Sequence, residues 1–521
     1  MKKIIFIIST LFAAIIAMAY LYFSKLNIDT GLNDTSLYAA TTNSPLVFSV
    51  QNDESIFKIL EDQLLFRNLL GEDKYNQILS LKTQIADRGD LNQFFSKKNI
   101  YISFHGNKQK EIDFLLSTQT NVNLDSASLF NSLKTAGIAI DSSKHPIMIT
   151  LPDERKFYIG FQDDLFLISP ASTSITNAMA GLKDRTNYDF IEEIKSAKRF
   201  GKNNLANLYM NFSYMPDLLK TVSSNKLSRA LALFENQKAY ALLNYNFGKE
   251  HFLLNGNTVI GESGSYYNLF KDLKPQEISI KNILPANTAN YVIYAIDDYR
   301  SWINALNKWF SQKKESEQIN ERIKRIKDKY GLDLNLVFPY YFKNQLVTFQ
   351  LKTGEVLGAV SLSNGDKVSQ LFLDLSKDYS SDIKLFKESD ILYSYFGEPF
   401  QDFKRPYYTI IDNYMVFSNY ASTLQVFLNN YNKDNQLVNT ESFISLANQL
   451  GGTSNISIYV NHSNSERILQ RSISTDFFRH FNSDEGLKKF NSFIYQMSGD
   501  NGKFQTNILL NADSLQVKAT N

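Results

Sequence analysis

Segments of this chain recur in the same order about 250 residues later, and this repetition constrains the fold more than any other feature. The segment TTNSPLVFSVQNDESIFKIL, which starts at Thr41, matches NTANYVIYAIDDYRSWINAL from Asn287 at an offset of 246 residues (287 − 41). KKNIYISFHG from Lys97 matches KNQLVTFQLK from Lys343 at the same offset (343 − 97). The first match reads as strand, polar turn and helix, and the second as the first strand of a hairpin.

Two later matches continue the series. FYIGFQDDLFLISPASTSITNAMAGL from Phe157 matches PYYTIIDNYMVFSNYASTLQVFLNNY from Pro406 at an offset of 249 (406 − 157). NLYMNFSYMPDLL from Asn207 matches SIYVNHSNSERIL from Ser457 at an offset of 250 (457 − 207). Four matches in one order, with an offset that drifts so little, indicate tandem duplication of one domain.

Local patterns within each copy predict an α+β fold. Alternation of apolar and polar residues over 46–50 is typical of a half-buried strand, and Asp163-Asp164 and Asp412-Asn413 suit hairpin turns. Amphipathic helices are expected after these hairpins, from about Ser172 and Ser422. The order of elements favours two tandem domains with mostly antiparallel sheets flanked by helices, and it disfavours a parallel, doubly wound sheet.

Domain boundaries follow from the repeat and from local composition. The segment GESGS with the nearby Pro275 indicates the junction between the copies. The predicted organisation is an anchor at 1–23, a stalk at 24–37, a first α+β domain at 38–262, a junction at 263–280 and a second α+β domain at 281–521.

The N-terminus predicts a membrane-spanning helix. An uncharged, apolar run from Ile4 to Phe23 matches the thickness of a bilayer's hydrocarbon core. Lys2 and Lys3 precede the run, and the positive-inside bias places the N-terminus in the cytoplasm. We therefore expect a single-pass protein of the inner (cytoplasmic) membrane, with the bulk of the chain in the periplasm.

A cleavable signal peptide is the alternative interpretation of this N-terminus. Ala17-Met18-Ala19 has the form that signal peptidase accepts, so cleavage would follow Ala19. The apolar run continues through Tyr20 to Phe23 and is longer than a usual signal sequence, which favours the anchor. Both interpretations export the rest of the chain.

Composition excludes several classes of chemistry. The chain has no cysteine, which removes disulfides, thiolate nucleophiles and cysteine-ligated metals. The net charge of +2 over 521 residues gives no basic footprint for nucleic acid. The densest basic run, from Arg322 to Lys329, is diluted by acidic residues at helical spacing and predicts a solvated helix face.

No motif in the sequence predicts a catalytic, cofactor-binding or metal-binding residue. The five histidines do not form H-E-x-x-H, and neither a phosphate-binding loop nor a G-x-S-x-G motif occurs. His462 corresponds to Phe212 in the first copy, which argues against a metal role. We therefore predict a protein that is not an enzyme and that uses no cofactor. The histidines are His105, His145, His251, His462 and His480.

Two other residue sets have a functional interpretation beside a structural one. Acidic residues could serve a glycosidase, although turns and helix caps account for them better; they are Asp163, Asp164, Asp297, Asp298, Asp382, Glu388 and Asp390. Aromatic residues of the second copy could form a stacking surface for a glycan or an apolar ligand, although packing between strands is preferred. They are Tyr291, Tyr294, Tyr340, Tyr341, Phe342, Tyr393, Tyr395, Phe396, Tyr407 and Tyr408.

The anchor at 1–23, the duplicated halves and the similar segments around Asp163 and Asp412 together resemble uncharacterised single-span bacterial envelope proteins with duplicated domains of unknown function. The resemblance implies location and architecture. The leading hypothesis is a membrane-anchored, non-enzymatic binding or scaffold protein of the cell envelope, with a possible envelope protein partner. Alternatives are a binder or carrier of lipid or another apolar ligand, and a carboxylate-dependent hydrolase.

Overall fold

The computed structural model describes most of the chain outside the N-terminus. The described residues are 34–51, 64–95, 98–107, 109–120, 126–184, 187–200, 206–223, 238–246, 251–261, 264–483 and 486–512. The predicted anchor at 1–23 and residues 24–33 of the predicted stalk lie outside these ranges. Among the helices within them, none combines the length and the hydropathy that crossing a bilayer requires.

Twenty strands of the described chain form one large sheet, and every pairing that we observe in it is antiparallel. This confirms the prediction of an α+β protein with antiparallel sheets. Strands of the first half (residues 34–261) pair in the order β4-β5-β6-β7-β3-β2-β1-β8-β9-β10. Their bounds are β1 Leu46–Gln51, β2 Asn99–Gly106, β3 Ile112–Gln119, β4 Ala139–Asp141, β5 Ile147–Thr150, β6 Lys156–Gln162, β7 Leu165–Ser169, β8 Ala206–Asn211, β9 Ala239–Asn246 and β10 His251–Ile260.

Strands of the second half (residues 264–512) repeat this pairing order strand for strand. From the outer edge inward they run β15-β16-β17-β18-β14-β13-β12-β20-β21-β22. Their bounds are β12 Thr288–Ala295, β13 Phe342–Leu351, β14 Val356–Leu362, β15 Ser376–Asp378, β16 Lys384–Phe386, β17 Tyr407–Ile411, β18 Tyr414–Ser418, β20 Ile456–Asn461, β21 Phe490–Asp500 and β22 Lys503–Ala512; β11 (Gln276–Glu277) pairs separately with β19 (Thr453–Ser454).

The register of the first strand corrects the sequence alignment by two residues. Val47 of β1 lies opposite Tyr209 of β8, whereas Tyr291 of β12 lies opposite Tyr459 of β20. With Tyr209 matched to Tyr459, Val47 corresponds to Tyr291 at an offset of 244 (291 − 47), not 246. Because side chains alternate between the faces of a strand, an even shift leaves the pattern of buried residues unchanged.

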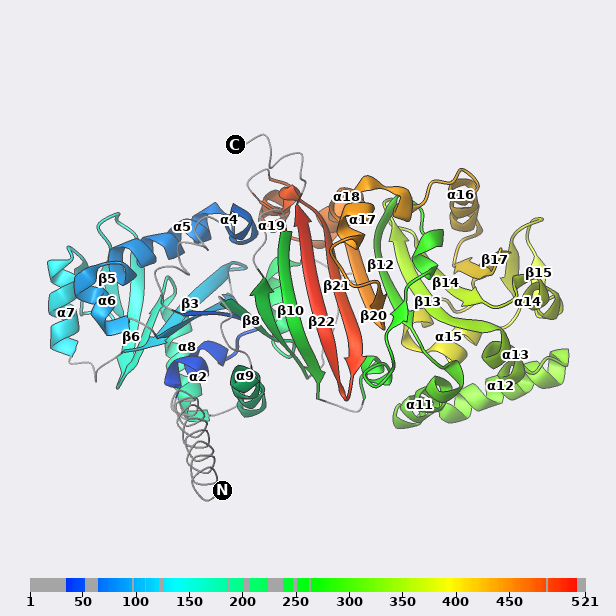
Figure 1. The fold of residues 1–521 in the computed structure, drawn as a ribbon, viewed down its shortest axis with the longest axis horizontal. Coiled ribbons are helices and arrows are strands. Elements are labelled where there is room, and N and C mark those ends of the chain that lie inside the picture. The colour runs from blue at the N-terminus through cyan, green and yellow to red at the C-terminus, as the bar shows by residue number, and fades with distance from the viewer. Residues whose placement is uncertain are drawn as a thin grey trace, which may run out of the picture.

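One pair of strands joins the halves into a continuous sheet (Figure 1). Strand β10 pairs with β22 from His251 opposite Asn511 to Thr258 opposite Phe504. Asn255 lies opposite Asn507, which occupies the same place in the second half at an offset of 252 (507 − 255). A contact between equivalent residues marks an approximate two-fold axis, as in a symmetric dimer.

A second contact lies on the same axis. Ser223 and Ile473, which are 250 residues apart (473 − 223), form an isolated antiparallel bridge. The Ser223 hydroxyl donates to the Ser472 carbonyl at 2.8 Å, and the Ser474 amide donates to the Val222 carbonyl at 2.8 Å. In Figure 1 the two halves accordingly look like copies turned by half a rotation about the centre of the picture.

Helices cover both faces of the sheet. Val47 and Phe48 are neighbours that point into different cores, so the two helical layers lie on opposite sides. The first layer contains α5 Glu72–Leu81, the π-helix η1 Lys82–Ala86, α6 Gly89–Phe95, α7 Ser126–Thr135, α11 Tyr299–Gln312, α12 Ser316–Tyr330, α13 Leu334–Tyr341, α14 Gly365–Leu371 and α15 Ile391–Phe396. The second contains α2 Thr35–Thr41, α8 Ser172–Asp184, α9 Tyr188–Phe200, α16 Ala421–Tyr431 and α17 Glu441–Ala447.

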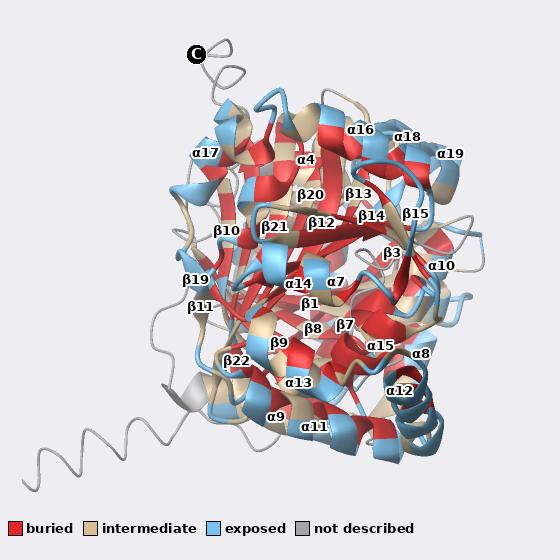
Figure 2. Cartoon of the chain, turned by 90° about the vertical axis from the view of Figure 1, so that its right-hand side faces the viewer, coloured by how far each residue is buried: buried red, intermediate tan, exposed pale blue. Residues whose placement is uncertain are grey.

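The remaining helices are short. They are α4 Leu64–Leu70, α10 Met215–Val222, α18 His462–Ser472, α19 Thr475–Phe481, and the 3-10 helices η2 Tyr266–Leu269, η3 Ile280–Ile283, η4 Glu398–Phe400, η5 Leu437–Asn439 and η6 Leu487–Lys489. Of these, η2 and η4 contribute to the first core, and η3 and η5 contribute to the second. Burial is concentrated on the strands, and the outer sides of the helices are exposed (Figure 2).

Helix α2 begins inside the segment predicted as a stalk. It starts at Thr35, and five of its seven residues are buried against the sheet and neighbouring helices. Asp34 caps the helix by accepting a hydrogen bond from the Leu37 amide, and it also accepts one from the Tyr101 hydroxyl at 2.6 Å. The folded domain therefore begins by Asp34.

The basic run from Arg322 to Lys329 forms a largely exposed side of α12, as predicted, with one exception. Arg322 is 9% exposed, donates to the Ser394 hydroxyl at 2.9 Å and pairs with Asp390 at 3.5 Å. This arginine is therefore part of the packed interior, and its charge is partnered there.

A buried group of hydroxyls lies between the two halves of the sheet. Its hydrogen bonds predict how a substitution there changes the stability of the protein. Thr258 of β10 contacts the Tyr495 hydroxyl at 3.0 Å and the Thr506 hydroxyl at 2.8 Å. Thr258→Val should lower the free energy of unfolding by about 1–3 kcal/mol, because it leaves buried hydroxyls with fewer partners. Urea denaturation measures this. Thr258→Ser, which keeps the hydroxyl, is the control, and equal losses for the two variants would contradict the role of the hydrogen bonds.

Candidate functional site

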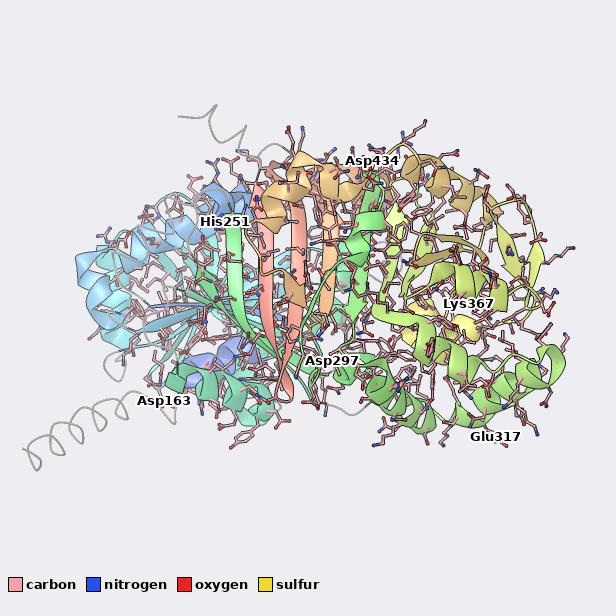
Figure 3. All side chains as sticks on the ribbon, turned by 45° about the vertical axis from the view of Figure 1, so that its right-hand side comes forward. Asp163, His251, Asp297, Glu317, Lys367 and Asp434 are labelled. Carbon is pink, nitrogen blue, oxygen red and sulfur yellow. The ribbon has the colours of Figure 1, made fainter. Side chains whose placement is uncertain are left out.

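The histidines considered as ligands or catalysts lie at separate places in the fold. His145 lies in the turn between β4 and β5, His251 begins β10, and His462 begins α18. Within the described ranges, no three histidine or acidic side chains lie close enough together to hold a metal ion. Figure 3 shows His251, Asp163 and Asp297 far apart.

The acidic residues occupy turns, helix caps and ion pairs. Asp163 and Asp412 have positive φ angles of 54° and 48° in the hairpin turns β6–β7 and β17–β18. Asp298 caps α11, and the hydrogen bond from the Ser301 hydroxyl lowers the pKa of its carboxyl. The Lys329 ammonium, which donates to Glu388 at 2.8 Å, likewise lowers the pKa of that carboxyl. A general acid needs a raised pKa, so neither carboxyl is arranged for that role.

The aromatic residues of the second half mostly form core. Tyr294, Phe342 and Tyr408 are buried, and Tyr395 stacks on Phe338 with ring centroids 4.4 Å apart. Tyr340 is 69% exposed and is an exception. These rings pack against one another, so the stacking surface considered from the sequence is occupied from within the protein.

A polar cluster surrounds His105 in the first half. The Ser103 hydroxyl lies 3.1 Å from His105 Nε2, and the Ser44 hydroxyl lies 3.4 Å from each ring nitrogen. Burial lowers the pKa of His105 to about 4, although the Asn43 carbonyl and Asp113 act in the opposite direction. Both serine side chains are fully buried, so neither hydroxyl is accessible to a substrate and the cluster is structural.

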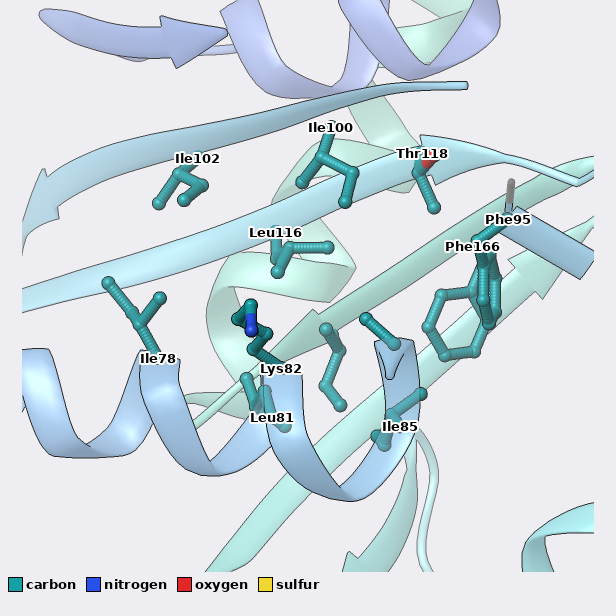
Figure 4. Close-up of a pocket in the computed structure, with 12 residues that line it drawn as sticks. Ile78, Leu81, Lys82, Ile85, Phe95, Ile100, Ile102, Leu116, Thr118 and Phe166 are labelled. Atoms are coloured by element: carbon teal, nitrogen blue, oxygen red, sulfur yellow. The ribbon is translucent and has the colours of Figure 1, made fainter. Parts of the chain in front are cut away.

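An apolar cavity lies in the first half between the helical layer and the sheet. Its interior has room of about 50 Å³, and the atom-free space between its walls, counted out to its opening to solvent, is about 540 Å³. The helices α5, η1 and α6 form one wall and the strands β2, β3 and β7 form the other (Figure 4). The lining residues are Ile78, Leu81, Lys82, Ile85, Ala86, Phe95, Ile100, Ile102, Leu116, Thr118, Phe166 and Ile168.

Only two lining side chains carry polar atoms. The Thr118 hydroxyl donates to the Asn99 carbonyl at 2.9 Å and so has a partner within the protein. Lys82 is 15% exposed, and its Nζ lies 2.7 Å from Asp87 Oδ2. The cavity therefore offers an apolar interior with one charged group on its wall.

The helical wall has an unusual backbone. Residues 82–86 form a π-helix directly after α5, and the Asp87 amide closes it by donating to the Lys82 carbonyl at 2.9 Å. Turns of π-helix are rare and occur often at functional sites. Here the widened turn places Lys82 and Ile85 on the cavity.

The corresponding space in the second half is filled by aromatic rings. In the strand pairing, Leu116 opposite Ile168 corresponds to Gly358 opposite Phe417. A Cβ atom added to Gly358 would lie 2.6 Å from Phe417 Cζ, so the ring occupies the volume that a larger residue would fill. Phe417 also packs against Phe400 and Phe403, with centroids 4.8 and 4.9 Å away. The cavity is thus a difference between two otherwise similar halves.

Sequence reasoning missed this site because its residues carry no chemical signature. Ile100, Ile102 and Leu116 are ordinary strand residues by pattern. The difference between copies was the available signal, since a leucine and an isoleucine stand where the second copy has glycine and phenylalanine. Such a signal required the exact register of β3 and β14, which sequence matching did not supply.

Comparison with known proteins does not assign a family. No family model matches the chain, and no curated protein matches it. A solved structure titled "Structure of crystal form IV of TP0453" aligns with 44% of this chain and 83% of its own, at 11% identity and a TM-score of 0.24. A likeness this low carries no conclusion about fold or function.

The close packing of aromatic rings around Phe417 predicts a large loss of stability when that ring is removed. Phe417→Ala should lower the free energy of unfolding by about 3–5 kcal/mol, because Phe417 is fully buried and its removal leaves a cavity. Urea denaturation measures the change. Tyr420→Ala removes a ring that is 68% exposed and should change stability by less than about 0.5 kcal/mol. Similar effects of the two substitutions would contradict the assignment of Phe417 to the core.

The lowered pKa of the half-buried His105 imidazole predicts a pH dependence of stability. His105 has a pKa of about 4 when folded, and an unfolded histidine has about 6.5, so the unfolded chain binds the proton first. Stability should therefore be highest above pH 6.5 and should fall as the pH drops toward 4. Burial lowers the pKa of His462 and His480 too, so their contributions have the same sign.

Denaturation between pH 4 and pH 7.5 tests this contribution. His105→Gln should flatten the dependence without removing it. His145→Gln changes an exposed turn residue and is the matched control. An unaltered pH dependence in His105→Gln would show that this imidazole does not contribute.

Proposed function

We propose that this protein binds an apolar ligand in the cavity of its first half. The observation that carries the proposal is the contrast between the halves: the space is open beside Ile168 and closed by Phe417 at the corresponding place. Protein interiors are close-packed, and a partly open space with walls of isoleucine, leucine and phenylalanine is costly to keep empty.

The dimensions favour a narrow ligand. An interior of about 50 Å³ is small beside most ligand pockets, which measure about 300–1,000 Å³. A single alkyl chain can enter such a slot from its opening to solvent, with about 0.8 kcal/mol gained for each CH₂ group removed from water. A flat or branched ligand would require movement of α5 and α6.

We further propose that the cavity arose by divergence of the two copies and that it lies close to the membrane. The repeated pairing order supports tandem duplication of one domain, after which the copies diverged at the cavity. The predicted anchor at 1–23 would hold this binding module beside the membrane, where alkyl chains are abundant. Binding alone accounts for the site, so we propose a non-enzymatic role in the cell envelope.

Photolabelling of the full-length chain in phosphatidylcholine vesicles tests the proposal. A hexadecanol that carries a diazirine on its chain should crosslink to peptides containing Ile78–Ala86 or Ile100–Thr118, mapped by mass spectrometry. Ile168→Phe places in the cavity the side chain that closes the second half. It should reduce labelling of these peptides by about tenfold, equivalent to about 1.4 kcal/mol.

Ile168→Val is the matched control because it leaves the cavity open, and it should label like the wild type. Thermal unfolding of both variants shows whether they are folded. Labelling confined to other peptides, or equal labelling of Ile168→Phe and the wild type, would rule out binding in this cavity.

A further inference from the structure

The polar side chains of the cavity wall determine which head group a bound ligand could pair with. Lys82 is the only charged residue among the lining residues, and the Thr118 hydroxyl is already bonded to a carbonyl. A ligand whose alkyl chain fills the slot therefore meets one charged side chain on the wall. That group is an ammonium, which favours a negative head group.

The ion pair of Lys82 is suited to exchange. Asp87, which pairs with Lys82, is 43% exposed; Lys82 begins the π-helix and Asp87 directly follows it. An exposed carboxylate gains little from such a pair, since water solvates it well when it is released. The hydrogen bond from the Asp87 amide to the Lys82 carbonyl involves only backbone atoms, so it can remain when the side chains separate. Release of the carboxylate thus leaves the helix intact.

We propose that the cavity selects a single-chain amphiphile with an anionic head group, carboxylate or phosphate, which pairs with Lys82 Nζ in place of Asp87. This inference rests on the proposed binding of an apolar ligand and adds the class of ligand to it. Lys82 lines the cavity beside Leu81 and Ile85 (Figure 4), so a ligand in the cavity lies within reach of its side chain.

Competition against the neutral photoactivatable hexadecanol separates the two proposals. The full-length chain is labelled in the presence of hexadecanoate, hexadecyl phosphate, hexadecanol or hexadecyltrimethylammonium. In the wild type, at least one of the two anions should compete about tenfold better than the alcohol, and the cation should compete worst. The stronger anion identifies the head group as carboxylate or phosphate.

Two substitutions of opposite effect locate the selectivity at Lys82. Lys82→Gln should abolish the preference for anions, measured within this variant as the ratio of competition by the anion to competition by the alcohol. Asp87→Asn should raise the affinity for anions severalfold, because it removes a carboxylate that pairs with Lys82. Lys134→Gln, on the exposed side of α7, is the control for a general change of charge.

The outcomes distinguish the two claims. Labelling by the neutral probe with equal competition by anion and alcohol would overturn the inference about the head group and leave the cavity as an apolar site. An anion preference that persists in Lys82→Gln would also overturn it. Absence of cavity labelling by the neutral probe would instead overturn the proposed function.

Discussion

Backbone hydrogen bonds between β10 and β22 are the interaction on which the rest of this structure depends. Each half ends in a long hairpin whose last strand would otherwise present a row of unpaired amides and carbonyls. Pairing the two last strands satisfies both rows at once, with Asn255 opposite Asn507 at the centre. The apolar core on one face then runs from the first half into the second without interruption, since Phe252 and Phe504 belong to the same cluster.

Much of this architecture was predictable from the sequence because it follows from local patterns. Hairpins around Asp163 and Asp412 were expected from turn residues, and both occur with positive φ at those positions. The register of β1 was not predictable to the residue, because a strand pattern repeats every two residues and a shift by two conserves it. The joining of the halves into one sheet was not predicted either. It depends on pairing between the edge strands β10 and β22, which are far apart in the sequence and carry no local pattern that would indicate it.

The candidate site was even less predictable from the sequence than the strand register. Residues with recognisable chemistry, such as Asp298 and Glu388, are explained by a helix cap and by ion pairs. The cavity instead consists of residues that any core contains, and it exists because Ile168 is smaller than Phe417 and no neighbouring ring fills the space. Packing of this kind depends on volumes contributed by five or more elements, so only the folded arrangement reveals it.

The joining of two similar halves provides a physical reason why one of them can keep such a space. At about 24 cal/mol per Å³, an empty interior of about 50 Å³ costs about 1 kcal/mol of stability. Single domains are stable by about 5–15 kcal/mol, so the cost is noticeable but tolerable. The second half has a densely packed aromatic core, with Phe417, Phe400 and Phe403 in edge-to-face contact, and the β10–β22 pair joins it to the first half in one continuous sheet. One copy can then serve as the support while the other retains an open site.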